Sequence, residues 1–253
     1  MHRLSRFFRH CLIVAGLALP ALVCAQQLTV SAAASLTDAF KEIGQRFEAG
    51  KPGSTVRFNV GASGVLIQQI SQGAPVDVFA SADQETMARG LEQKLLDADT
   101  LRDFAANTLV LIVPAQETPP VGKVSDLNQP AVKRIAVGKF ASVPVGRYTK
   151  QALESSGAWA ALEPKIVYAD NVRQVLDYVA RGEVEAGFVY RTDAALMPDK
   201  VKIVQTVEGH APVRYPVAVV SESRQKALAH EFVAFLSGAE GQAILARFGF
   251  ARP

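Results

Sequence analysis

Short apolar runs rich in β-branched residues alternate along the chain with longer runs in which apolar positions recur at helical spacing. Nine short runs predict strands, at Leu28–Ser31, Val56–Val60, Asp77–Ala80, Leu109–Val113, Ile135–Val137, Ile166–Tyr168, Ala186–Val189, Val201–Val204 and Pro216–Val220. Between them, apolar residues follow the 3.6-residue period at 36–47, 66–70 and 172–179, and a long helical stretch runs over 224–236. Strands that alternate with helices are typical of an α/β protein with mainly parallel sheets.

Two of the strands suggest a division of the chain. Leu109–Val113 is a continuous apolar run that ends at Pro114, and Pro216–Val220 is a second such run. They flank about 100 residues of strand and helix, which is near the usual size of one domain. We therefore expect two Rossmann-like lobes with mixed, mainly parallel sheets, joined by two crossover strands. Lobe 1 would comprise residues 26–107 and 217–253, and lobe 2 residues 108–216. A single continuous sheet remains the alternative, because periodicity alone does not separate the two.

The first 25 residues follow a different pattern. A basic start precedes the apolar run Cys11–Val23, and the small residues Cys24 and Ala25 follow before Gln26. This order is typical of a secretory signal peptide. The run is shorter than the roughly 20 residues that a membrane-spanning helix needs, and Pro20 interrupts it. We predict export to the periplasm with cleavage after Ala25. An uncleaved anchor, or a lipoprotein acylated at Cys24, is the alternative.

Removal of residues 1–25 changes the charge of the chain. The full sequence has a net charge of +3, but without Arg3, Arg6 and Arg9 it keeps 24 Lys and Arg against 24 Asp and Glu. No overall field then favours nucleic acid or an anionic membrane, and we expect neither as a partner.

Both cysteines, Cys11 and Cys24, lie within the first 25 residues. Disulfides, thiolate metal sites and cysteine nucleophiles are therefore excluded beyond residue 25.

Small and hydroxyl-bearing residues follow several predicted strands, where helices begin. Ser35 follows the first strand, with Asp38 in the position of a capping box, and Ser63 follows the second. In the second half, Val143–Gly146 and Asp170–Val172 open two further helices. Ligands of parallel sheets bind beyond the carboxyl ends of strands, and helix N-termini attract anions. Each junction alone is explained by a helix cap or a turn, but together they make anion binding plausible.

Over its whole length after residue 25, the sequence resembles the periplasmic molybdate-binding proteins of ABC transporters. The matching segments are Ser31–Ala39, Gly73–Asp83, Asn107–Pro114, Val143–Lys150, Asp170–Leu176, Gly187–Tyr190 and Tyr215–Val220. Each segment is short, but seven of them in the family's order and spacing are highly specific. The resemblance implies a type II periplasmic-binding fold, a monomer without enzymatic activity or cofactor, that delivers a small inorganic oxyanion to an ABC transporter permease.

Carried over residue by residue, the resemblance implies five ligand contacts. Ser35 and Ser63 would each offer a hydroxyl and a backbone N–H, Val145 and Val172 their backbone N–H groups, and Tyr190 its hydroxyl. Position 145 often holds alanine in the family, so the extra methyl groups of valine could tighten the pocket while the backbone contact survives. The oxyanion would be held by hydrogen bonds, with no side chain coordinating a metal.

All five contacts are uncharged donors. A fully deprotonated tetrahedral dianion, molybdate or tungstate, has only acceptors and fits such a site. Phosphate is partly protonated near neutral pH, and its unpaired proton would cost about 1–3 kcal/mol. Sulfate or another tetrahedral oxyanion in the same fold is the first alternative, because only cavity size would reject sulfate.

An exported serine hydrolase is the second alternative. Ser35 or Ser63 would be its nucleophile, but the sequence has no Gly-x-Ser-x-Gly elbow. A Ser-x-x-Lys match at Ser223–Lys226 lacks the companion motifs of transpeptidases. His210 and His230 have no evident acid partner, and we interpret both as structural or solvated.

Several other residues have a structural interpretation. Asp77 and Asp83 are expected to serve as a cap and a contact in lobe packing rather than as metal ligands. Trp159 is assigned to the core, and Arg147 and Arg191 to solvated positions.

Overall fold

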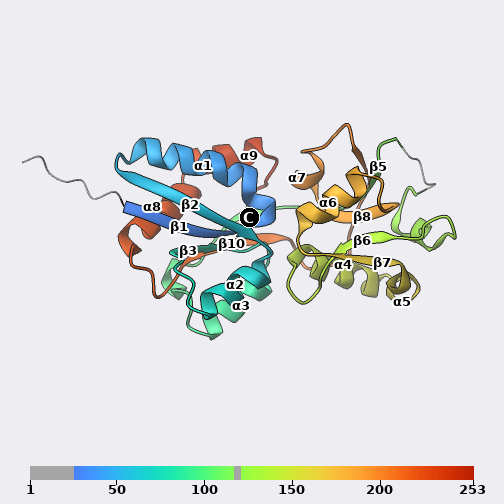
Figure 1. Ribbon diagram of the computed structural model, residues 1–253, viewed down its shortest axis with the longest axis horizontal. Helices are drawn as coiled ribbons and strands as arrows, with labels where there is room; N and C mark the ends of the chain where they lie inside the picture. The colour runs from blue at the N-terminus through green and yellow to red at the C-terminus, as the bar shows by residue number, and fades with distance from the viewer. Residues whose placement is uncertain (1–25, 117–120) are drawn as a thin grey trace, which may run out of the picture.

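Two five-stranded sheets form the two ends of an elongated molecule (Figure 1). The computed structural model describes residues 26–116 and 121–253. The predicted signal peptide, residues 1–25 with cleavage after Ala25, lies outside the described residues. Here lobe 1 denotes the first sheet with its helices, and lobe 2 denotes the second. Within the described ranges, no helix combines the length and apolar character that crossing a membrane requires.

The sheet of lobe 1 has the strand order β2-β1-β3-β10-β4. Its parallel strands are β1 (Gln26–Ala33), β2 (Ser54–Gly61) and β3 (Val78–Ala80). The antiparallel strands β10 (Arg214–Val219) and β4 (Arg102–Ala106) complete it. The carboxyl ends of the three parallel strands therefore lie at one edge, which faces lobe 2 (Figure 1).

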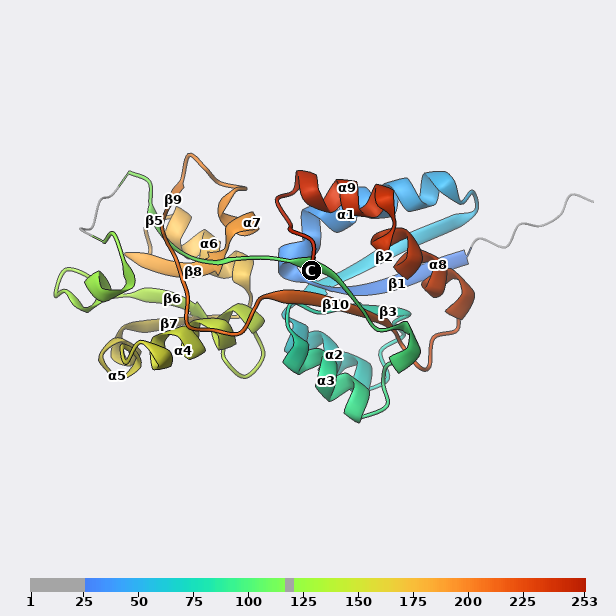
Figure 2. The ribbon, with the colours of Figure 1, turned by 180° about the vertical axis from the view of Figure 1, so that it is seen from behind.

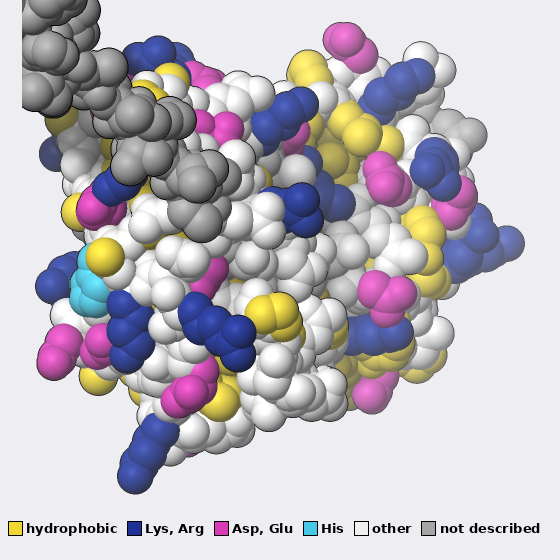
Figure 3. All heavy atoms as spheres, turned by 60° about the vertical axis from the view of Figure 1, so that its left-hand side comes forward, with side chains coloured by type: hydrophobic (Ala, Val, Ile, Leu, Met, Phe, Trp, Pro, Cys, Tyr) yellow, Lys and Arg dark blue, Asp and Glu magenta, His cyan; other side chains and the backbone are white. Residues whose placement is uncertain are grey.

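Five helices cover the two faces of this sheet. On one face lie α1 (Thr37–Gly50), α8 (Lys226–Ser237) and α9 (Ala239–Arg247), and on the other lie α2 (Ser63–Ser71) and α3 (Gln84–Glu92) (Figures 1 and 2). In α1 the buried residues follow the helical period predicted for 36–47. On the surface of lobe 1 shown in Figure 3, positive and negative side chains are interspersed.

The sheet of lobe 2 repeats the arrangement of the first, with the order β7-β6-β8-β5-β9. Here β6 (Ile135–Gly138), β7 (Ile166–Ala169) and β8 (Ala186–Tyr190) are parallel, and β5 (Leu109–Pro114) and β9 (Val201–Thr206) run antiparallel to their neighbours. Every residue of β5 and β8 is buried, which explains their continuous apolar sequence. Each sheet has two parallel and two antiparallel pairings, so the sheets are mixed as predicted.

Lobe 2 has four helices in the part of the chain that the structure describes. The two longer ones that pack on the sheet are α4 (Pro144–Ser155) and α6 (Val172–Ala180), and α5 (Trp159–Leu162) and α7 (Arg191–Ala194) are short. In Figure 1, α6 lies on one face of the sheet and α4 on the other. Short 3₁₀ turns occur at Ala34–Leu36, Ala98–Thr100, Val124–Asn128 and Glu163–Lys165.

The chain passes between the lobes twice, from β4 to β5 at residues 107–108 and from β9 to β10 at residues 207–213. The strands predicted as crossovers, β5 and β10, directly follow these two connections. The two-lobed α/β architecture is confirmed. The boundaries 26–107, 108–216 and 217–253 stay a prediction, and β10 begins at Arg214, inside the range expected for lobe 2. The sequence pattern missed β4, because its five residues include two charges and no β-branched side chain.

Candidate functional site

A small cleft separates the carboxyl-terminal edges of the two sheets. Its cavity volume is about 10 Å³. Its lining residues are uncharged, and they are Ala33, Ala34, Ser35, Gly61, Ala62, Ser63, Ala82, Val143, Pro144, Val145, Asn171, Val172 and Tyr190. The structure thus brings together all five residues predicted as ligand contacts, three from lobe 2 and two from lobe 1. Their contact with a ligand stays a prediction.

Ser35 lies in the 3₁₀ turn between β1 and α1. The capping box predicted for Ser35 and Asp38 is wrong, because α1 begins at Thr37 and its N-cap residue, Leu36, has no side-chain cap. The Ser35 hydroxyl instead lies 3.0 Å from the hydroxyl of Tyr215. The tight turn places Ser35 ahead of the α-helix, so its side chain is not used by the backbone of α1.

Ser63 is the first residue of α2, and it is fully buried. Its hydroxyl oxygen accepts a hydrogen bond of 3.0 Å from the backbone N–H of Ala82, two residues beyond the end of β3. The bond fixes the side chain against lobe 1. Because the oxygen is the acceptor in this bond, the hydroxyl proton remains available for another acceptor.

Val145 and Val172 lie in the first turns of the two helices of lobe 2 that border the cleft. Pro144 is the first residue of α4 and has no N–H, so Val145 supplies the first N–H group of that helix. Asn171 caps α6, accepting a hydrogen bond of 3.1 Å from the N–H of Gln174. The first N–H groups of a helix have no intrahelical partner, so the two helices present donors at the positive ends of their dipoles.

Tyr190, at the end of β8, has its hydroxyl buried. Among the described residues this hydroxyl oxygen has no hydrogen-bond partner. The ring is held by edge-on contacts with Tyr148 and Tyr215, at centroid distances of 6.5 and 5.9 Å. Burial raises the pKa of Tyr190 well above its ordinary value, so the group keeps its proton. The side chain is therefore a fixed donor that lacks an acceptor.

Arg147 of α4 bridges the lobes beside the cleft. Its guanidinium donates to Asp83 of lobe 1, with Nε 2.8 Å from Oδ2, and to the hydroxyl of Thr86 at 2.7 Å. The side chains of Arg147 and Asp83 are only 10% and 5% exposed. The solvated position predicted for Arg147 is wrong, because helix α4 points this side chain across the interface rather than outward. The contact in lobe packing expected of Asp83 is confirmed.

A second bridge starts from Arg173, next to Val172 in α6. Its Nε donates to the buried carboxylate of Asp193 in lobe 2 at 2.7 Å, and its Nη1 donates to Asp38 of lobe 1 at 2.8 Å. Its Nη2 lies 3.3 Å from the carbonyl oxygen of Ser35. Burial raises the pKa of Asp193 to about 6, although Arg173 acts to lower it. Because Arg173 follows Val172 and bonds to the main chain of Ser35, it links these two predicted contact residues across the lobes.

The lobes also meet through their backbones. The N–H of Gly64 in α2 donates to the carbonyl oxygen of Ser142 in lobe 2 at 2.9 Å. A Cβ atom at position 64 would lie 2.7 Å from that same oxygen. Glycine at this position is therefore what permits the close approach of the lobes.

The sequence did not single out Arg173, Asn107 or Tyr215, and it assigned Arg147 to solvent. All four residues lie in the segments 107–114, 143–150, 170–176 and 215–220 that carry the family resemblance. Their place in these segments was the signal that could have marked them as candidates. The partners of these four residues lie in the other lobe or in the other connection between the lobes, so local sequence does not reveal them.

The remaining candidates have partners away from the cleft. The ring nitrogens of His210 lie 2.6 and 3.0 Å from the carbonyl oxygens of Ala211 and Val207. Arg191 is exposed, and Trp159 is half-buried against Phe140. Among residues 26–116 and 121–253, no three His, Cys, Asp or Glu side chains gather as a metal site would require.

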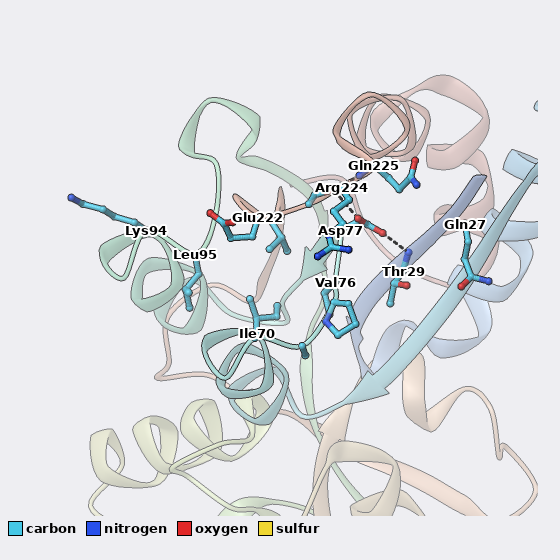
Figure 4. Close-up of a pocket in the computed structure, with 15 residues that line it drawn as sticks. Gln27, Thr29, Ile70, Val76, Asp77, Lys94, Leu95, Glu222, Arg224 and Gln225 are labelled. Atoms are coloured by element: carbon cyan, nitrogen blue, oxygen red, sulfur yellow. Dashed lines mark hydrogen bonds between the residues drawn. The ribbon is translucent and has the colours of Figure 1, made fainter. Parts of the chain in front are cut away.

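A larger hollow lies at the far side of lobe 1, around Asp77 (Figure 4). Both carboxylate oxygens of Asp77 are already used there. Oδ2 accepts from the N–H of Thr29 at 2.8 Å, and Oδ1 accepts from the hydroxyl of Ser223 at 2.7 Å. Asp77 therefore ties β1 to the segment before α8 and caps no helix of the described residues. The cap expected of this pair of aspartates is formed by Asp83, which accepts from the N–H of Thr86 in α3. Ser223 donates its hydroxyl proton in this link.

Comparison with known proteins finds bacterial solute-binding proteins by sequence and by structure. The model of the bacterial extracellular solute-binding protein family matches residues 28–251. The molybdate-binding protein ModA of Escherichia coli is 38% identical over 230 residues, which cover 88% of each chain. The structure of the Azotobacter vinelandii periplasmic molybdate-binding protein aligns with a TM-score of 0.78 and 24% identity, covering 89% of this chain and 99% of that one. The sulfate-binding protein SubI of Mycobacterium tuberculosis aligns with a TM-score of 0.79 and 18% identity, covering 90% and 87%. These two structures share the fold.

Proposed function

Because the chain belongs to the bacterial extracellular solute-binding protein family, we propose that it binds molybdate between its lobes and delivers it to the permease of an ABC importer. Tungstate, a tetrahedral dianion like molybdate, is a second ligand of the same site. The contacts are the hydroxyl and N–H groups of Ser35 and Ser63, the N–H groups of Val145 and Val172, and the hydroxyl of Tyr190. The fold alone does not choose the ion, since the sulfate-binding protein SubI has it too.

The buried hydroxyl of Tyr190 is the observation that carries this proposal. A buried donor without an acceptor costs about 1–3 kcal/mol, so native proteins rarely keep one without a reason. This hydroxyl has no partner among the described residues, and the residue lines a cleft into which two helix N-termini of its own lobe open. An anionic oxygen in the cleft supplies the acceptor that the protein does not.

The charge of the lining supports a fully deprotonated ligand. Among the described residues no charged side chain lines the cleft, and the nearby cations Arg147 and Arg173 are each paired with carboxylates. The ligand is therefore held by neutral donors and helix dipoles rather than by a countercharge. A protonated anion such as hydrogen phosphate carries an O–H group of its own. This donor would face a donor of the protein instead of an acceptor, which disfavours binding.

The surroundings of the two serines support a binding protein rather than a hydrolase. A serine nucleophile needs a base within hydrogen-bond reach. The hydroxyl partners of Ser35 and Ser63 are the Tyr215 hydroxyl and the Ala82 N–H, and neither is such a base. We propose that the chain acts in the periplasm as a monomer, without a cofactor and without nucleic acid as a partner.

A thermal-shift panel tests the proposal. The purified protein would be heated with molybdate, tungstate, sulfate or phosphate at equal concentrations. A ligand in thousandfold excess over its Kd stabilises the native state by about 4 kcal/mol, and the melting temperature rises accordingly. We expect this rise with molybdate and tungstate. A rise with sulfate alone would overturn the molybdate assignment, and ester turnover that is lost in Ser35→Ala would overturn the binding role.

A further inference from the structure

A line of polar groups connects Ser35 to both connections between the lobes; Ser35 and Tyr215 are buried, and Asn107 is half-buried. We propose that Asn107 and Tyr215 are positioning residues that turn the hydroxyl proton of Ser35 toward the bound oxyanion. Asn107 lies in the connection between β4 and β5, and Tyr215 lies in β10 just after the other connection. This inference rests on the proposed function, because it assigns a role to residues around the same site.

The orientation of the Asn107 amide is fixed by its neighbours. Its Oδ1 accepts a hydrogen bond of 2.9 Å from the N–H of Thr108. The NH₂ group therefore points the other way, where Nδ2 lies 2.8 Å from the hydroxyl of Thr192 and 3.3 Å from the hydroxyl of Tyr215. An amide nitrogen can only donate, so the oxygen of Tyr215 accepts in the second of these bonds.

Among the described residues, the hydroxyl proton of Tyr215 has one possible acceptor. The side chain is fully buried, and among the described residues its hydroxyl lies within hydrogen-bond distance of Ser35 and Asn107 alone. The Asn107 nitrogen is a donor, so Ser35 Oγ, at 3.0 Å, is the acceptor that remains. Burial also raises the pKa of Tyr215 well above its ordinary value, which keeps the proton in place. A buried hydroxyl proton without an acceptor is strongly disfavoured, so Tyr215 donates to Ser35.

Ser35 Oγ then resembles Ser63 Oγ, which accepts from the N–H of Ala82. In both serines another group of the protein donates to the hydroxyl oxygen. The hydroxyl proton is therefore free to point into the cleft that both residues line. A serine without such a donor can rotate and accept a proton from its ligand instead. The relay from Asn107 through Tyr215 therefore sets Ser35 as a donor, which suits an oxyanion that carries no proton.

Two substitutions test the relay by different routes. Tyr215→Phe removes the hydroxyl and keeps the ring, which packs edge-on against Phe104 and Phe250. Asn107→Asp replaces the donor with a carboxylate that accepts the Tyr215 proton, so the Tyr215 oxygen would accept from Ser35 and withdraw its proton from the ligand. Tyr148→Phe is the matched control, because this ring also contacts Tyr190 but its hydroxyl lies outside the relay.

The measurement is calorimetric titration of the full-length exported protein with molybdate, together with the melting temperature of each ligand-free variant. We expect Tyr148→Phe to bind as the wild type does, and Tyr215→Phe and Asn107→Asp to bind roughly tenfold or more weakly. For Asn107→Asp we also expect affinity to recover as the pH falls, because the protonated carboxyl donates again. Wild-type affinity in both relay variants, or an affinity loss in Asn107→Asp that does not change with pH, would overturn the relay. If the wild type itself does not bind molybdate, the proposed function fails instead.

Discussion

Replacing Tyr190 with phenylalanine removes one oxygen atom from the wall of the cleft and leaves the ring in place. The hydroxyl has no partner among the described residues, so the substitution breaks no bond within them. The ring contacts with Tyr148 and Tyr215 do not use this oxygen. The ligand-free protein and the complex should therefore respond in opposite directions.

The size of each response follows from the burial of the group. A hydrogen bond to a charged acceptor contributes about 1.5–3 kcal/mol, and each 1.4 kcal/mol is about tenfold in Kd. We expect the Kd for molybdate to rise roughly 10- to 150-fold in Tyr190→Phe. Loss of a buried, unpaired hydroxyl removes a desolvation cost of about 1–3 kcal/mol. The melting temperature of the ligand-free variant should therefore equal or exceed that of the wild type.

Calorimetric titration gives the Kd, and thermal denaturation without ligand gives the stability. Tyr178→Phe is a suitable control, because this partly buried tyrosine of α6 does not line the cleft. An unchanged Kd in Tyr190→Phe would refute the claim that this hydroxyl donates to the ligand. A lower melting temperature without ligand would show that the hydroxyl has a partner within the protein.

Three further substitutions test the contacts between the lobes and the charge of Asp193. Gly64→Ala should weaken molybdate binding in calorimetry, because its Cβ would lie 2.7 Å from the Ser142 carbonyl oxygen and push the lobes apart. Unchanged affinity would contradict close contact of the lobes. Arg147→Met should weaken binding more than tenfold by the same assay, since it leaves the Asp83 carboxylate buried without its cation; wild-type affinity would argue against the bridge. Burial holds the pKa of Asp193 at about 6, above its ordinary value, so the folded state binds this proton more tightly than the unfolded state. As the pH rises from about 4 to about 7, the unfolding free energy of the wild type should therefore fall relative to Asp193→Asn by roughly 2 kcal/mol in urea titrations. Parallel profiles of the two proteins would contradict this prediction.

The location of the cleft could be predicted from the sequence because strand and helix order determines where carboxyl ends of strands lie. Ser35, Ser63, Val145 and Val172 each follow a predicted parallel strand, and the structure gathers them at facing edges. Tyr190 differs, because no local pattern marks a tyrosine at the end of a strand as pointing into a cleft. Its assignment came from the family resemblance alone.

The contacts across the lobes could not be predicted, because they depend on tertiary packing. Asn107 and Tyr215 are 108 residues apart, and Arg147 and Asp83 are 64 apart. Ser35 shows the opposite problem, because its sequence fits a capping box while the backbone forms a 3₁₀ turn instead. Local patterns therefore gave the positions of the donors but not the hydrogen bonds that orient them.

A crystal structure of the protein grown with molybdate tests the central claim most directly. We predict one tetrahedral ion between the lobes, with an oxygen within hydrogen-bond distance of the Tyr190 hydroxyl and others at the N–H groups of Val145 and Val172. An ion bound outside this cleft, or a Tyr190 hydroxyl still without a partner in the complex, would contradict the account.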